Sequence, residues 1–107
     1  MPVYLGEFEQ LVLLAILRLG DKATGAAIRD VVEDGSGRTV WIGAVHTTLD
    51  RGIGKGLVRA ATVDLAEAGG KPRRVYALEP AGRDAVQHAY ATWVRMTRGL
   101  KPKLEPR

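Results

Sequence analysis

The spacing of apolar residues changes along this chain from the period of a helix to that of a strand and back, which limits the folds open to it. Between residues 5 and 55, apolar side chains recur at three- and four-residue steps, as is typical of helices. Residues 57–65 and 73–78 instead alternate every second residue, and Gly69 and Gly70 between them favour a tight turn. The predicted elements are helices over 5–19, 24–33 and 43–55, a short edge strand over 38–41, hairpin strands over 57–65 and 73–78, and a last helix over 80–98.

The third predicted helix has two unlike faces. Val45, Leu49 and Ile53 are four residues apart and form a narrow apolar seam. Gly52 and Gly54 each cost about 1 kcal/mol relative to alanine in a helix interior, so we expect a weak last turn. The opposite face is small, polar and basic, and it holds Ala44, Thr47, Arg51 and Lys55.

Charge is distributed unevenly between the two parts of the chain. The whole chain carries a formal net charge of +4. Residues 1–70 contain seven basic and nine acidic side chains, whereas residues 71–107 contain nine basic and three acidic ones. A basic half on a small domain indicates an anionic partner, with nucleic acid as the first candidate.

Composition excludes several classes of protein. The chain has 107 residues, the size of one small domain, and its lack of cysteine excludes disulfides and thiolate metal sites. The longest apolar run, residues 11–17, is far shorter than a membrane span of roughly 18 residues, and the first residues lack a basic signal region. Two isolated histidines and no paired acid–base set favour neither a metal site nor an enzyme. We expect a cytoplasmic protein without a cofactor or membrane contact.

Three helices followed by a β-hairpin form the layout of a winged helix-turn-helix. In that fold the third helix enters the major groove of DNA and the hairpin, or wing, lies along the backbone. The predicted fold class is therefore mainly α with a small β-hairpin (α+β). We expect residues 1–79 to form the winged helix-turn-helix, 80–98 a C-terminal dimerisation helix in the same compact unit, and 99–107 a basic tail.

Several segments resemble one family of bacterial proteins. They are LGEFEQLVLLAIL (5–17), TGAAIRDVV (24–32), GAVHTTLDR with KGLV (43–51 and 55–58), and GGKPRRVYALEPAGR (69–83). The last is the most specific, since it joins a basic wing, an aromatic-containing strand and a Pro-Ala-Gly helix start. On these segments the chain resembles the PadR family of transcriptional regulators. The resemblance implies a dimeric DNA-binding regulator, usually a repressor, whose last helix pairs protomers; some small members hold flat apolar ligands between them.

The chain departs from the family pattern at three places. His46 stands where the family usually carries a tyrosine in the recognition helix. Residues 52–54, Gly-Ile-Gly, replace the usual Leu-Glu, and we expect Ile53 to take the buried role of that leucine with a rotated or loosened last turn. Glu79 replaces the usual threonine before Pro-Ala-Gly and is a poorer helix cap.

The residues expected to contact DNA belong to the third helix and the hairpin. Arg51 can read guanine and Thr47 can meet thymine or phosphate, the alternative being an ordinary solvated helix surface. Lys71 and Arg73 are expected on phosphates, although basic residues there also protect edge strands from aggregation. His46 either donates to a phosphate or is held by structural hydrogen bonds. The predicted DNA-binding residues are Ala44, His46, Thr47, Thr48, Arg51, Lys55, Gly70, Lys71, Arg73 and Arg74.

The last helix carries aromatic residues that a small domain cannot bury alone. Tyr90 and Trp93 share one face, and the economical partner for such a stripe is the same helix of a second chain. Trp93 either packs in that interface, the simpler hypothesis, or lines a pocket for a small planar effector. The predicted dimer-interface residues are Leu5, Phe8, Val86, Ala89, Tyr90, Trp93 and Val94.

The sequence thus predicts a sequence-specific transcriptional regulator, a repressor that binds double-stranded DNA as a homodimer at a near-palindromic operator. The alternative is a winged-helix ligand sensor or protein-interaction module without DNA binding, which Gly52 and Gly54 in the recognition helix make conceivable.

Overall fold

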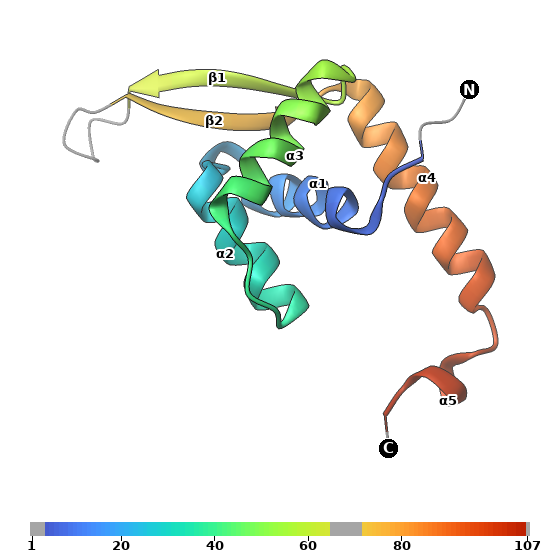
Figure 1. The fold of residues 1–107 in the computed structure, drawn as a ribbon. Helices are drawn as coiled ribbons and strands as arrows, with labels where there is room; N and C mark the ends of the chain where they lie inside the picture. The colour runs from blue at the N-terminus through green and yellow to red at the C-terminus, as the bar shows by residue number, and fades with distance from the viewer. Residues whose placement is uncertain (1–3, 65–71, 107) are drawn as a thin grey trace.

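A computed structural model describes residues 4–64 and 72–106 of the chain. Three helices precede a β-hairpin, and a long helix follows it (Figure 1). The elements are α1 (Glu7–Leu19), a short 3-10 helix η1 (Gly20–Lys22), α2 (Gly25–Ser36), α3 (Ile42–Gly54), β1 (Val58–Asp64), β2 (Pro72–Leu78), α4 (Pro80–Thr97) and α5 (Lys101–Leu104). This order confirms the predicted α+β class; α5 is a single exposed turn within the predicted tail.

Local signals in the sequence set both ends of α2. The backbone N–H of Ala27 donates to the Thr24 hydroxyl at 3.2 Å, which satisfies one of the free donors at the start of the helix. Gly37 ends the helix in the left-handed conformation at φ 72°, where its N–H donates to the carbonyl of Glu33. The helix therefore continues to Ser36, three residues beyond the predicted end.

The predicted edge strand over 38–41 does not form, and this prediction is wrong. The segment is an irregular connection that ends at Trp41, which precedes the first turn of α3. A strand needs a neighbouring strand for its backbone groups, and here the N–H of Val40 instead donates to the Glu33 carboxylate at 2.9 Å. The hairpin instead has a further backbone pairing with Thr24, the residue before α2, which forms an isolated bridge with Val75 of β2.

The hairpin is a regular antiparallel pair over the described residues. Its register runs from Val58 opposite Leu78 to Asp64 opposite Pro72. The predicted Gly69-Gly70 turn and the end of the first predicted strand at residue 65 lie outside the described residues.

The core lies where α1, α2 and α3 meet the base of the hairpin. Each helix contributes the apolar stripe expected from its periodicity. The largest side chains that are fully buried are Leu13, Ile28, Leu49, Leu57, Val12 and Val45. Tyr76 of β2 and Val86 of α4 are also buried in this cluster, so the start of α4 is part of the same core.

Two glycines allow close packing around β1. A Cβ on Gly82 of α4 would lie 2.1 Å from the backbone oxygen of Leu57, so only glycine fits there without movement. A Cβ on Gly52 of α3 would lie 2.9 Å from a methyl of Val58. The expected loosening of the last turn of α3 is not seen. The helix continues through Gly52 to Gly54, and Ile53 is half-buried against the core.

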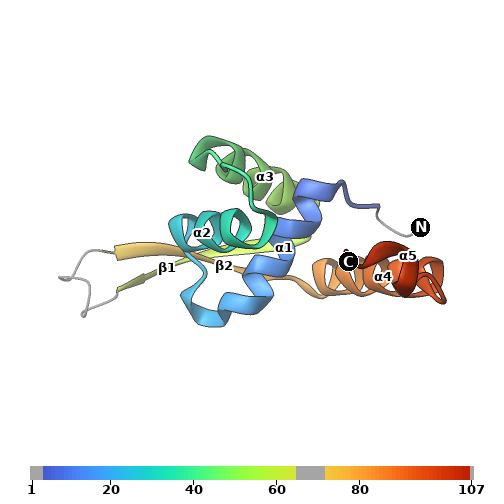
Figure 2. The ribbon, with the colours of Figure 1, turned by 90° about the horizontal axis from the view of Figure 1, so that it is seen from below.

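The protomer is more extended than a compact chain of its length. Its radius of gyration is 15.4 Å, against about 13 Å expected for 107 residues. Its accessible surface of 7664 Å² exceeds the roughly 5,800 Å² expected for a compact monomer of this mass. Much of α4 stands away from the other helices in Figures 1 and 2. Among the described helices, none has the combined length and apolarity needed to span a membrane.

Candidate nucleic-acid interface

One face of α3 is open along its whole length. The buried side of the helix holds Val45, Leu49 and Gly52, as the apolar seam predicts for the first two. Of the predicted contact residues, Ala44, His46, Thr47 and Arg51 of this helix and Lys55, which directly follows it, are exposed, and Thr48 is half-buried. The structure thus places these side chains on α3 or at its end, apart from the side that is packed against the core.

The start of α3 and the outer end of the hairpin project to the same side of the molecule. Figure 1 shows both on the side away from α4, and the perpendicular view in Figure 2 agrees. A helix and a β-ribbon that project together can engage one extended partner at two places. This relation between elements distant in sequence is what a duplex-binding winged helix requires.

The hairpin carries arginines on both of its faces. Arg74 lies opposite Thr62 and Arg73 opposite Val63, and both arginines are exposed. Neighbouring residues of a strand point to opposite faces, and Arg74 shares its face with Tyr76, over whose ring its guanidinium carbon lies at 5.6 Å. Two other predicted contact residues, Gly70 and Lys71, lie outside the described residues.

Lys55 has a structural partner that the sequence pattern did not indicate. Its ammonium group lies 3.0 Å and 3.3 Å from the two carboxylate oxygens of Glu9 on α1, 46 residues earlier. The Glu9 side chain is only 11% exposed, so the lysine compensates a carboxylate that is mostly removed from water. Lys55 therefore joins α3 to α1, and its charge is less available to a partner than that of Arg51.

His46 lies at the crossing of α2 and α3. Its imidazole carbon Cε1 would be 2.9 Å from a Cβ on Gly25, the first residue of α2, so the glycine leaves room for the ring. The residue as a whole is exposed. One edge of the ring thus packs against α2, while the side chain still reaches the open surface.

The structure adds two residues to the candidate interface that the sequence pattern did not single out. Asp50 is exposed on the open side of α3, and it forms no ion pair with any residue in the described ranges. Trp41 is exposed immediately before the helix. The prediction from the sequence took the face around Thr47 and Arg51 as the open one and therefore did not include Asp50. It did not include Trp41 because a strand was expected over 38–41.

The excess positive charge after residue 70 does not form one patch. Arg73 and Arg74 lie on the hairpin, whereas Arg95 and Arg98 lie at the far end of α4. Figure 1 shows these two regions at opposite ends of the molecule. Only the first group lies on the same side of the molecule as the start of α3.

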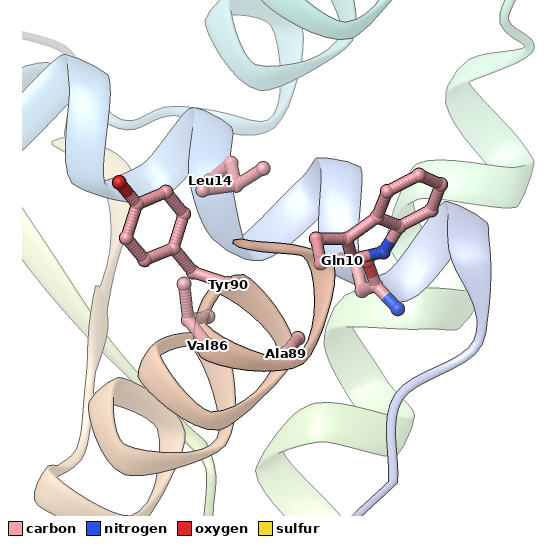
Figure 3. A pocket seen from close by; sticks show the side chains of 6 residues that line it. Gln10, Leu14, Val86, Ala89 and Tyr90 are labelled. Carbon is pink, nitrogen blue, oxygen red and sulfur yellow. The ribbon is translucent and has the colours of Figure 1, made fainter. Parts of the chain in front are cut away.

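A second surface feature lies between α1 and α4, away from α3. An apolar groove of about 260 Å³ is lined by Gln10, Leu14, Val86, Ala89, Tyr90 and Trp93, and we call it the α1–α4 groove. Leu14 and Tyr90 point into the same space from the two helices in Figure 3. Tyr90 is 71% and Trp93 63% exposed, and Val94 is also exposed.

The other predicted interface residues are less accessible. Leu5 and Phe8 are half-buried against the core, Ala89 is half-buried, and Val86 belongs to the core itself. Of the predicted set, the exposed residues are thus the aromatic pair and Val94 on the outer part of α4.

Similar folds occur among solved structures. The one described as the complex structure of hsRosR-S4 has 27% sequence identity and a TM-score of 0.65, covering 89% of this chain and 76% of that one. A PadR family transcription regulator from Clostridium difficile has 19% identity and a TM-score of 0.67, covering 92% and 99%. A PadR family transcriptional regulator from Eggerthella lenta has 23% identity and a TM-score of 0.64, covering 94% and 88%.

No family model matches the sequence, and the search of curated proteins found no match either. The chain has a PadR-like winged-helix fold, which confirms the fold predicted from its sequence.

Proposed function

We propose that this protein is a sequence-specific DNA-binding transcriptional regulator, a repressor, with α3 in the major groove and the hairpin on the backbone. The observation that carries the proposal is that the start of α3, whose outer residues are exposed, and the arginine-bearing hairpin project to the same side of the molecule. The PadR-like fold supports it, because structures with this fold are described as transcription regulators rather than as enzymes.

The two elements have different parts in this proposal. Arg51 can form two hydrogen bonds with a guanine edge, and Thr47, one turn away, can meet a thymine methyl or a phosphate. Arg73 and Arg74 supply cations for phosphates, which carry affinity but little sequence information. A homodimer would place two copies of α3 in half-sites about 34 Å apart on a near-palindromic operator.

The test begins with selection of duplexes from a random pool by the purified protein. Arg51→Ala should lose preference at one base pair, with discrimination reduced by about 1–3 kcal/mol. Arg73→Ala should instead weaken binding to all duplexes alike. It should also reduce the slope of log K against log salt concentration by about one, the amount expected for one lost phosphate contact. Arg98→Ala removes the same charge beyond α4, away from the hairpin and α3, and should change neither property.

Enrichment of no sequence at low ionic strength would refute DNA recognition. Equal and uniform losses for Arg51→Ala and Arg73→Ala would instead refute the assignment of base contact to α3.

We propose that the α1–α4 groove is the self-association surface of the protein. The exposed Tyr90 and Trp93 form an apolar stripe of a kind that usually meets a partner. The extended shape of the protomer and its large accessible surface agree with a chain that buries more area on pairing. A C2 pair would bring the same helix face of each protomer together.

Self-association is tested by light scattering at defined concentrations. Wild-type protein should have the mass of two chains, and Trp93→Ala should shift the equilibrium toward one chain. Trp41→Ala is a matched control, because Trp41 is similarly exposed but lies on another part of the surface. Equal behaviour of the two variants would contradict the assignment.

The groove also favours a second candidate function, the sensing of a small planar effector. Its walls are apolar apart from the amide of Gln10 and the edges of the two aromatic rings. Trp93 emission should then be quenched by a flat aromatic probe such as a bisbenzimide dye in Trp41→Phe protein, where Trp93 is the only tryptophan. Unchanged emission across a titration would leave packing as the role of this residue.

A further inference from the structure

The start of α3 presents an apolar surface that no described part of the protomer covers. Trp41 is 76% exposed and Ile42 is 41% exposed, and the two are adjacent where the connection from α2 enters the helix. The carbonyl of Trp41 accepts from the N–H groups of Ala44 and Val45, at 3.0 Å and 3.3 Å, so its backbone is fixed by the first turn. An exposed tryptophan on a backbone fixed in this way, beside an exposed isoleucine, indicates a partner surface.

The proposed self-association surface does not include these two residues. The α1–α4 groove lies between α1 and α4, and Figures 1 and 2 place α4 on the side of the molecule away from the start of α3. Neither Trp41 nor Ile42 lines this groove. Trp41 and Ile42 instead directly precede the exposed residues Gly43 and Ala44 at the start of α3.

We propose that Trp41 and Ile42 read thymine through its C5-methyl group in the major groove. This inference rests on the proposed function, and it adds residues that determine specificity to that interface. The first residues of a recognition helix are the ones that reach base edges. The methyl of thymine is the apolar group that distinguishes base pairs in the major groove, so an apolar pair at this place fits thymine rather than guanine.

The neighbouring side chains support an apolar rather than an ionic contact. Arg38, three residues before Trp41, points its guanidinium to the Glu7 carboxylate at 3.1 Å and lies 5.9 Å from the centre of the Phe8 ring. That cation is thus engaged with α1. Ala44, the third residue of the helix and three residues after Trp41, is also exposed and apolar.

The experiment compares thymine with deoxyuridine, which pairs identically but lacks the C5-methyl group. A duplex selected from a random pool by wild-type protein is synthesised again with deoxyuridine at each thymidine in turn, and dissociation constants are measured at fixed salt. Removal of one buried methyl should weaken wild-type binding about fourfold at one or two positions. Trp41→Ala and Ile42→Ala should bind the thymine duplex more weakly and lose the difference between the two bases.

Leu104→Ala is the matched control. Leu104 is 59% exposed, but it lies in α5, at the end of the molecule away from the start of α3 in Figure 1. This variant should keep both the affinity and the fourfold difference. Because Trp41 and Ile42 are exposed, the melting temperatures of Trp41→Ala and Ile42→Ala should match that of wild type. This measurement separates a lost contact from a lost fold.

Two outcomes would overturn the inference alone. In the first, wild-type protein binds thymine and deoxyuridine duplexes equally at every position. In the second, Trp41→Ala weakens both duplexes by the same factor, which would assign its indole to the backbone. In either case Arg51→Ala still alters the selected sequence, so the proposed function survives. If no duplex is enriched by wild-type protein, both proposals fail together.

Discussion

Substitution of Gly82 by alanine tests whether α4 is fixed to the core by a close backbone contact. The new Cβ would lie 2.1 Å from the carbonyl oxygen of Leu57, more than 1 Å inside ordinary contact distance. That oxygen also accepts a hydrogen bond from the N–H of Glu79 at 2.9 Å, so it cannot rotate away freely. Overpacking costs about 1–3 kcal/mol, and the higher helix propensity of alanine returns at most about 1 kcal/mol.

The expected result is a free energy of unfolding lowered by about 2 kcal/mol, or a melting temperature lowered by about 10 °C. Two other glycines provide a graded comparison. At Gly52 the new Cβ would lie 2.9 Å from a side-chain methyl of the buried Val58 rather than against backbone, so we expect a smaller loss than at Gly82. At Gly35 of α2 nothing lies within 4 Å, and alanine should stabilise by about 0.5–1 kcal/mol.

The assay is thermal unfolding followed by circular dichroism, with every variant at the same concentration because the proposed self-association would shift the midpoint. The expected order of stability is Gly35→Ala above Gly52→Ala above Gly82→Ala. A Gly82→Ala variant as stable as wild type would show that α4 can move away from the base of the hairpin without cost, and the reasoning from the close contact would be refuted.

The remaining predictions concern a helix cap and an ion pair. Thr24→Ala removes the acceptor at the start of α2 and should lower the free energy of unfolding by about 1 kcal/mol in a denaturant titration. Thr24→Ser keeps a hydroxyl acceptor and should therefore retain most of that stability. Lys55→Met leaves the mostly buried carboxylate of Glu9 without its cation and should cost about 1–2 kcal/mol. Adding Glu9→Gln should recover part of that loss in a double-mutant cycle, and strict additivity would mean that the pair contributes nothing.

The helices and the hairpin were predictable because their signals are local. Apolar residues at helical spacing set the core faces of α1, α2 and α3, and the cap at Thr24 placed the start of α2 correctly. Pro80 placed the start of α4 in the same way. Each of these signals lies within one turn of the position that it determines.

The errors came from places where distant contacts decide the structure. Residues 38–41 have strand-like composition but no neighbouring strand, so they become the connection into α3. Gly52 and Gly54 are poor helix residues in isolation, yet α3 continues to Gly54, and Gly52 is buried where a larger side chain would meet Val58. The pairing of Lys55 with Glu9 joins residues 46 apart, which no local pattern indicates.

The same limitation explains what the sequence could say about the candidate interface. Spacing placed Thr47 and Arg51 on an open helix face, but only the fold shows that this face and the hairpin project together. The open side of α3 also carries Asp50, which offsets Arg51, so α3 itself offers little net charge to phosphates. In the proposed complex with DNA, affinity from counterion release would therefore come mainly from the hairpin. The nearly neutral helix would be suited to base edges, where an unbalanced cation would bind any sequence equally well.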